Sequence, residues 1–166
     1  MQKSKKIVLL GHFGVGKTSL IRQFVNSSFS ESYKVTIGVH ISKKELIIET
    51  LGPLSLIIWD IEGTKDLTSV RDAYLLGTDG VLYVFDITRP KSYENIQDDL
   101  KIIKQKCPKA SIQIIGNKLD LIEKEVLNQL DKKNQLTYDF LTSAKTGEHV
   151  NTAFLNLAKN CILPKS

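Results

Sequence analysis

The stretch GHFGVGKT at residues 11–18 directly follows the apolar run IVLL at residues 7–10 and has the spacing G-x-x-x-x-G-K-T. A glycine-rich turn between a strand and a helix exposes backbone N–H groups beside the positive end of the helix, which suits a polyphosphate. Lys17 adds a point charge, and the Thr18 hydroxyl can bind Mg²⁺. The stretch therefore predicts a nucleoside triphosphate site, with an ordinary glycine turn as the alternative; its expected residues are Gly14, Val15, Gly16, Lys17, Thr18 and Ser19.

The length and composition are typical of one globular domain, covering residues 1–166. No apolar run approaches the roughly 18 residues of a membrane-spanning helix. Cys107 and Cys161 lie far apart without a neighbouring histidine, which favours reduced thiols in a cytoplasmic protein. The net charge of +5 is spread along the chain and favours a solvated surface over a nucleic-acid partner. We expect a monomer.

The order of apolar and amphipathic segments predicts alternating strands and helices. Strands are expected at residues 5–10, 39–51, 54–59, 80–85, 112–115 and 137–141, and helices at 18–26, 67–76, 90–106, 123–133 and 150–162. The turn at Gly52-Pro53 makes the second and third strands an antiparallel hairpin. The expected fold is α/β of the P-loop class: a six-stranded, mostly parallel sheet with one antiparallel edge strand and helices on both faces. Ligands on such sheets bind at the carboxyl ends of the strands.

Two further motifs stand where strands are expected to end. Asn117-Lys118-Leu119-Asp120 follows the fifth strand, and Ser143-Ala144-Lys145 follows the sixth. Together with residues 11–18 they resemble the Ras-like small GTPases, over essentially the whole chain. The stretches TIGV at 36–39, WDIEG at 59–63 and TSAKTG at 142–147 resemble the Rab branch most.

The resemblance implies a guanine site. The carboxylate of Asp120 can accept from both the N1–H and the exocyclic amine of guanine, a donor pair that adenine lacks. Phe29 is expected against the guanine ring, Lys118 along the nucleotide, and the Ala144 N–H at the guanine oxygen. The remaining members of this expected site are Asn117, Ser143 and Lys145. Asn and Asp are also common in ordinary turns after strands, which is the alternative for Asn117 and Asp120.

The resemblance also implies GTP or GDP bound together with Mg²⁺. Thr18 and Thr36 would bind the metal directly, and Asp60 would hold it through water. The γ-phosphate would be contacted by Lys17, Thr36 and the N–H of Gly63.

Two loops would therefore be ordered by the γ-phosphate and relax on its loss. One runs from Ser30 to Val39 (switch I) and the other from Gly63 to Tyr74 (switch II). Both are expected to contact effectors, exchange factors and GTPase-activating proteins. Tyr33 of switch I would cover the phosphates, with an ordinary surface tyrosine as the alternative.

The chain departs from the family after Asp60. The family usually has a threonine, a small residue, a glycine and then the glutamine that orients the attacking water, whereas this chain has Ile61, Glu62, Gly63 and Thr64. Thr64 is too short to replace the glutamine. The carboxylate of Glu62 beside a γ-phosphate would have to point outward, meet a cation such as Arg71 or Lys65, or act on water as a base.

Two departures lie elsewhere. Phe13 stands where the family has a small residue, so its ring would crowd the place where a partner's arginine would enter. The final residues Leu163-Pro164-Lys165-Ser166 are not a C-a-a-X box, so no encoded lipid anchor is expected.

These features predict a guanine-nucleotide switch that hydrolyses GTP slowly without a partner. The residues expected to matter for hydrolysis are Lys17, Thr36, Glu62, Gly63 and Thr64. One alternative is a pseudo-GTPase that binds GTP stably with negligible hydrolysis. Another P-loop class, such as a small-molecule kinase, is disfavoured by the NKLD motif.

Overall fold

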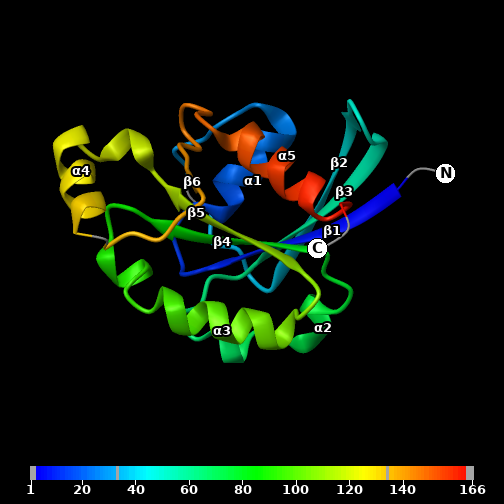
Figure 1. Ribbon diagram of the computed structural model, residues 1–166, viewed down its shortest axis with the longest axis horizontal. Coiled ribbons are helices and arrows are strands. Elements are labelled where there is room, and N and C mark those ends of the chain that lie inside the picture. Colours follow the sequence, from blue (N-terminus) through cyan, green and yellow to red (C-terminus); the bar gives the residue numbers. More distant parts are fainter. Residues whose placement is uncertain (1–2, 33, 134, 164–166) are drawn as a thin grey trace.

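The computed structural model describes residues 3–32, 34–133 and 135–163. Within these residues the strands form one sheet in the order β2-β3-β1-β4-β5-β6, in which β2 alone is antiparallel to its neighbour (Figure 1). The strands are β1 (Lys3–Gly11), β2 (Val39–Ile48), β3 (Gly52–Ile61), β4 (Gly80–Asp86), β5 (Ser111–Asn117) and β6 (Phe140–Leu141). The helices are α1 (Lys17–Asn26), α2 (Asp72–Leu75), α3 (Ile96–Lys106), α4 (Lys124–Lys132) and α5 (Val150–Asn160). This arrangement confirms the predicted fold class and the antiparallel hairpin.

The sheet is covered by helices on both faces, with α1 and α5 on one side and α2 and α3 on the other (Figure 1). Alternation along β1 sends Ile7 and Leu9 to the first side and Val8 and Leu10 to the second, so each face has its own apolar cluster. Every residue of β4 is buried, as expected for a central parallel strand. Within the described parts of the chain, no helix is both long and apolar enough to cross a membrane.

The prediction of one helix over residues 67–76 is wrong. A 3-10 turn at Leu67–Ser69 is followed by extended backbone at Val70 and Arg71 before α2 begins. The Asp66 carboxylate accepts from the Thr68 amide at 2.9 Å and caps the short turn. Apolar spacing suited a continuous helix, but the cap and the buried, extended Val70 end the turn early.

The predicted helix over residues 90–106 is also interrupted. A 3-10 turn at Pro90–Ser92 precedes α3. The Ser92 hydroxyl is fully buried and accepts from the backbone N–H of Asp86 at 3.0 Å, which ties this turn to the end of β4. A side chain bonded to the neighbouring backbone competes with helix continuation.

The sixth strand was predicted over residues 137–141 but contains Phe140–Leu141 alone. Just before it, the Asp139 N–H donates to the Ile114 carbonyl at 2.9 Å, while the Asp139 carboxylate accepts from the Ile114 N–H at 2.7 Å. The Asp139 side chain thus accepts the hydrogen bond from the Ile114 N–H that a backbone carbonyl would accept in a regular pair of strands. Tyr33 and the last three residues of the C-terminal tetrapeptide lie outside the described residues.

Candidate functional site

The phosphate-binding loop predicted from residues 11–18 lies at the carboxyl end of β1 and leads into α1. Its glycines Gly14 and Gly16 have φ angles of 74° and 101°, in the left-handed region that side chains disfavour. A Cβ at Gly16 would lie 2.3 Å from the Asn117 side-chain nitrogen. Glycine at position 16 therefore allows both the turn and the close approach of β5.

Lys17 is buried beneath this loop. Its ammonium donates to the carbonyl oxygens of Gly11 at 3.1 Å and His12 at 3.0 Å. Burial lowers the pKa of Lys17 to about 8, although the charge of Asp60 opposes the shift. An anion bound in the loop would raise this pKa and keep the lysine charged at higher pH.

Asn117 connects three segments of the site. Its side-chain nitrogen donates to the Val15 carbonyl at 3.0 Å, and its oxygen accepts from the Thr142 hydroxyl at 3.0 Å and the Ala144 N–H at 3.2 Å. The side chain is buried, so these bonds are shielded from water. Asn117 therefore fixes the phosphate loop against the end of β5 and the segment that follows β6.

Asp120 and Lys118 are each oriented by a second residue. The Ser143 hydroxyl donates to the Asp120 carboxylate at 2.7 Å, and the Lys118 ammonium lies 2.7 Å from the buried Asp86 carboxylate. Lys118 has a left-handed φ of 69°, which is uncommon for a residue with a side chain and often occurs at functional sites. The Lys118 carbonyl also accepts from the Leu121 N–H at 2.9 Å, so both its backbone and its side chain have partners.

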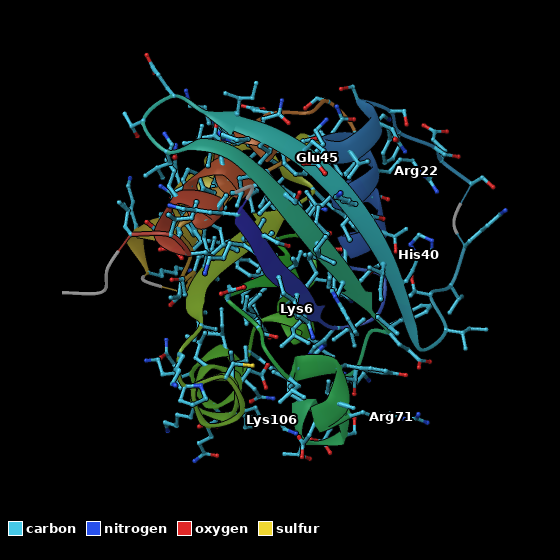
Figure 2. The ribbon with its side chains drawn as sticks, turned by 90° about the vertical axis from the view of Figure 1, so that its right-hand side faces the viewer. Lys6, Arg22, His40, Glu45, Arg71 and Lys106 are labelled. Atoms are coloured by element: carbon cyan, nitrogen blue, oxygen red, sulfur yellow. The ribbon has the colours of Figure 1, made fainter. Side chains whose placement is uncertain are left out.

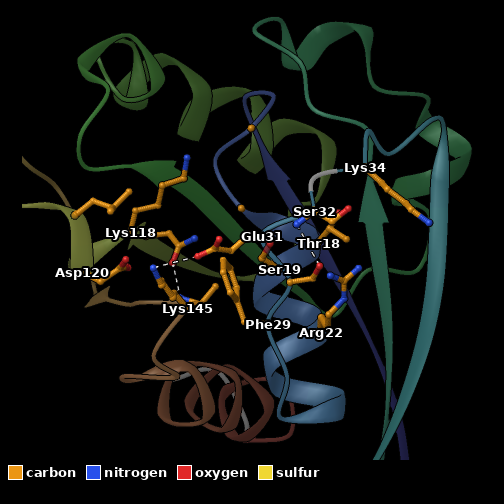
Figure 3. Close-up of a pocket in the computed structure, with 16 residues that line it drawn as sticks. Thr18, Ser19, Arg22, Phe29, Glu31, Ser32, Lys34, Lys118, Asp120 and Lys145 are labelled. Carbon is orange, nitrogen blue, oxygen red and sulfur yellow. Dashed lines mark hydrogen bonds and ion pairs between the residues drawn. The ribbon is translucent and has the colours of Figure 1, made fainter.

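A cavity of about 310 Å³ lies between these residues and α1 (Figure 3). Asp120, Lys118 and Lys145 stand at one side, Thr18, Ser19 and Arg22 stand at the other, and Phe29 lies between them (Figure 3). The cavity therefore brings the NKLD and SAK motifs to the same space as the phosphate loop. Its lining comprises Gly14, Gly16, Thr18, Ser19, Arg22, Phe29, Ser30, Glu31, Ser32, Lys34, Asn117, Lys118, Asp120, Leu121, Ala144 and Lys145.

The three residues expected to hold Mg²⁺ lie together beside the loop. The Thr18 hydroxyl donates to Asp60 Oδ2 at 2.5 Å, and the Thr36 hydroxyl lies 2.8 Å from that of Thr18. Asp60 Oδ1 is buried and has no hydrogen-bond partner among the described residues. Burial raises the pKa of Asp60, as expected for a carboxylate short of compensating charge.

This donor set fits Mg²⁺. All of its atoms are oxygens, and one of them is an orphaned carboxylate oxygen. Within the described residues, no three His, Cys, Asp or Glu side chains gather into a metal-binding group. A single carboxylate with hydroxyls matches the way Mg²⁺ is usually bound, with phosphates and water as its other ligands.

The residues that follow Asp60 make contacts with different parts of the molecule. A Cβ at Gly63 would lie 2.4 Å from the Cα of Phe13, so Gly63 packs directly against the phosphate loop. The Thr64 hydroxyl instead accepts from the Asp66 N–H at 3.0 Å, within its own turn. The Glu62 carboxylate accepts from the Gly38 N–H at 3.2 Å, and among the described residues it forms no ion pair with Arg71 or Lys65.

Sequence reasoning missed several residues that support the site. Asp86 pairs with Lys118, Thr142 donates to Asn117, and the Arg89 guanidinium donates to the carbonyl of Phe13, whose ring is half exposed. Asp86 and Thr142 lie at the ends of apolar segments, as do the site residues that the sequence predicted. Their position at a strand end was the signal that could have identified them. Arg89 gave no such signal, because its partner is a backbone atom far away in the sequence.

The chain matches the sequence model of the Ras family over residues 6–163. It is similar to Ras-related protein Rab-13 of Canis lupus familiaris, with 35% identity covering 95% of this chain and 80% of the relative. Rab7 of Drosophila melanogaster is 35% identical over 95% of this chain and 80% of its own length. Rab-7b of Mus musculus is 36% identical over 95% and 82%.

These matches cover nearly the whole chain and include each of the segments that meet at the cavity. A GTP-binding switch is the activity that such relatives imply in general. The chain belongs to the Ras family of small GTPases and is most similar to its Rab branch.

Proposed function

We propose that this protein binds GTP and GDP together with Mg²⁺, hydrolyses GTP slowly, and signals the bound nucleotide through switch I and switch II. The observation that carries the proposal is the single cavity that joins Asp120 to the phosphate loop, with Asn117 bonded to both sides. A purine at one end and phosphates at the other would span this cavity.

The base would bind near Asp120. Its carboxylate is held by the Ser143 hydroxyl and lines the cavity, where it can accept two hydrogen bonds from guanine. Phe29 and the stem of Lys118 would cover the two faces of the ring. The Ala144 N–H, already close to Asn117, would meet the guanine oxygen.

The phosphates would bind the loop N–H groups and the Lys17 ammonium. Mg²⁺ bound by Thr18 and Thr36, with Asp60 behind it, would neutralise charge on the phosphates. The close packing of Gly63 on the phosphate loop supports an N–H contact from Gly63 to the γ-phosphate. Loss of that phosphate would remove contacts from both switch loops at once.

Hydrolysis would rely on charge stabilisation more than on positioning of water. Lys17 supplies the charge, whereas neither Glu62 nor Thr64 lines the small hollow around Lys17, Thr36 and Asp60. Positioning of the attacking water accounts for much of phosphoryl-transfer catalysis. Without a residue that positions this water, we expect slow GTP turnover.

Partner proteins would bind the switch loops, as they do for the family in general. The exposed apolar side chains of Val35, Ile37 and Ile41 lie in or beside switch I. Tyr74 of switch II lies near Trp59 of β3, at 6.4 Å between ring centroids. Apolar and aromatic side chains of this kind are enriched in interface cores.

The decisive experiment identifies the nucleotide that remains with the purified protein and measures competition between GTP and ATP. We expect bound GDP or GTP, Mg²⁺-dependent retention, and no displacement by ATP. Preferential binding of ATP would refute the guanine assignment and favour another P-loop class.

A pseudo-GTPase is the second candidate, and the placement of Thr64 and Glu62 away from the phosphate hollow favours it. Single-turnover hydrolysis with and without cell extract distinguishes the two functions. A switch GTPase is accelerated by a factor in the extract, whereas a pseudo-GTPase keeps its GTP in both conditions.

A further inference from the structure

The β2–β3 hairpin ends in an unusual pair. Val39 and Ile61 are its last paired residues, and the next pair would be Gly38 and Glu62. The Glu62 N–H donates to the Gly38 carbonyl at 2.8 Å, as it would in a regular antiparallel ladder. In such a pair the Gly38 N–H would bond to the Glu62 carbonyl, but here it donates to the Glu62 side chain, Oε2, at 3.2 Å.

The departure has a local cause. Gly38 has a left-handed φ of 70°, which a regular strand residue does not adopt, and Gly63 packs against the Phe13 backbone instead of continuing the ladder. The carboxylate at position 62 supplies the acceptor for the Gly38 N–H. A small side chain at position 62 has no atom that could do so.

The Glu62 side chain lies in a groove between the two switch loops. The groove is lined by Gly38 on one side and by Val70, Arg71 and Tyr74 on the other. Figure 2 shows His40 on β2 and Arg71 beside α2 on the same side of the molecule. The carboxylate is thus directed to the end of switch I rather than to the hollow around Lys17 and Asp60.

We propose that Glu62 is a positioning residue that holds the end of switch I through the Gly38 amide, in the GDP-bound as well as the GTP-bound protein. Both bonded atoms belong to the chain, so neither the γ-phosphate nor the metal takes part in the contact. Thr36 stands only two residues before Gly38, so this anchor would limit how far Thr36 can move from Thr18 and Asp60 when the γ-phosphate is lost. The inference rests on the proposed function, because it concerns which part of the switch the nucleotide controls.

Two substitutions isolate the hydrogen bond. Glu62→Ala removes the acceptor, whereas Glu62→Gln removes the charge and keeps a side-chain oxygen of the same reach. Glu49→Ala is a matched control, because it removes an exposed carboxylate from the opposite end of the same hairpin. The readout is the rate of amide exchange with water at Gly38, measured by NMR on the ¹⁵N-labelled protein with GDP and Mg²⁺.

We expect Glu62→Ala to accelerate exchange at Gly38 about fivefold or more, the size of effect that loss of one hydrogen bond produces. Glu62→Gln and Glu49→Ala should each stay within about twofold of the wild-type protein, since neither removes the acceptor. Equal exchange in the alanine variant and the wild type, or equally fast exchange in the alanine and glutamine variants, overturns the proposal.

Chromatography of the nucleotide bound by each sample separates this inference from the proposed function. A wild-type protein that retains no guanine nucleotide refutes the proposed function alone, since the exchange rates of Gly38 in the same variants then decide the role of Glu62 without nucleotide. Melting temperatures measured in parallel show that faster exchange does not reflect global unfolding.

Discussion

Lys17 makes the phosphate loop sensitive to pH. Burial lowers its pKa to about 8, so the free loop loses a proton above that pH, while a bound polyphosphate raises the pKa again. Binding above pH 8 then requires proton uptake, and affinity for GDP should fall by up to about tenfold per pH unit as the pH rises.

Calorimetric titration of GDP between pH 7 and 9.5 measures this dependence. Lys17→Met should bind at least about tenfold more weakly at pH 7, because charge-assisted contacts to phosphate are lost, and should show a much flatter pH profile. Parallel profiles for the variant and the wild type would assign the titration to another group.

Asp120 should determine the choice of base. Xanthine carries a carbonyl where guanine has its C2 amine, so Asp120→Asn should favour xanthosine triphosphate over GTP. Competition binding of the two nucleotides provides the measurement. Ser143→Ala serves as the control: it removes the hydroxyl that orients Asp120 and should weaken GTP binding without reversing the preference. An unchanged preference for GTP in Asp120→Asn would remove Asp120 from the base site.

Single residues were predictable where a side chain follows an apolar strand. Asn117 and Asp120 stand at such positions, and their chemistry indicates what they would bind. The supporting residues were less visible, because Asp86 and Thr142 act through the side chains of Lys118 and Asn117, which folding brings close. Motif spacing therefore predicted the candidate ligand contacts and missed part of the network that orients them.

The start of switch II is a turn stabilised by its own side chains. The Thr64 hydroxyl accepts from the Asp66 N–H, and the Asp66 carboxylate accepts from the Thr68 N–H. Apolar periodicity predicted a helix across this region, since periodicity does not register such caps. An element that depends on a few exposed hydrogen bonds is easily rearranged, as a switch requires.

This geometry predicts how Thr64 affects hydrolysis. Turnover without a partner should be on the order of 10⁻⁴ per second or slower, the range of unassisted Ras. Thr64→Gln should raise the rate several-fold because the longer amide can reach and orient water. Thr64→Ala should leave it within about twofold, since the hydroxyl bonds within its own turn. Single-turnover assays give these rates, and brisk hydrolysis by the wild type would contradict this account.

The whole molecule should unfold as one unit. The two apolar clusters share the strands of a single sheet, so loss of either helical layer would expose one face of the strands on which the other layer packs. Phe154 stacks on Phe24 at 4.2 Å on one side, and Ile103 is buried on the other. Phe154→Ala and Ile103→Ala should each lower the free energy of unfolding by about 3 kcal/mol and shift the same transition.

Urea unfolding followed by both fluorescence and far-UV circular dichroism tests this expectation. The single domain was predicted from length and composition, and two separable unfolding transitions would contradict that prediction. The mostly parallel sheet could be anticipated from the alternation of elements, whereas the shortness of β6 could not, because one aspartate side chain replaces a strand contact there.

The bond between Asn117 and the Val15 carbonyl joins residues 102 positions apart, which has a consequence for synthesis. A growing chain exposes its phosphate loop early, but the partners of that loop leave the ribosome much later. We expect nascent chains in which residue 140 is the last to emerge to retain no labelled GDP, and chains exposed beyond residue 163 to retain it. Nucleotide capture would then mark the completion of this domain during translation, and a product terminated before the segment after β6 would be released without ever having been loaded.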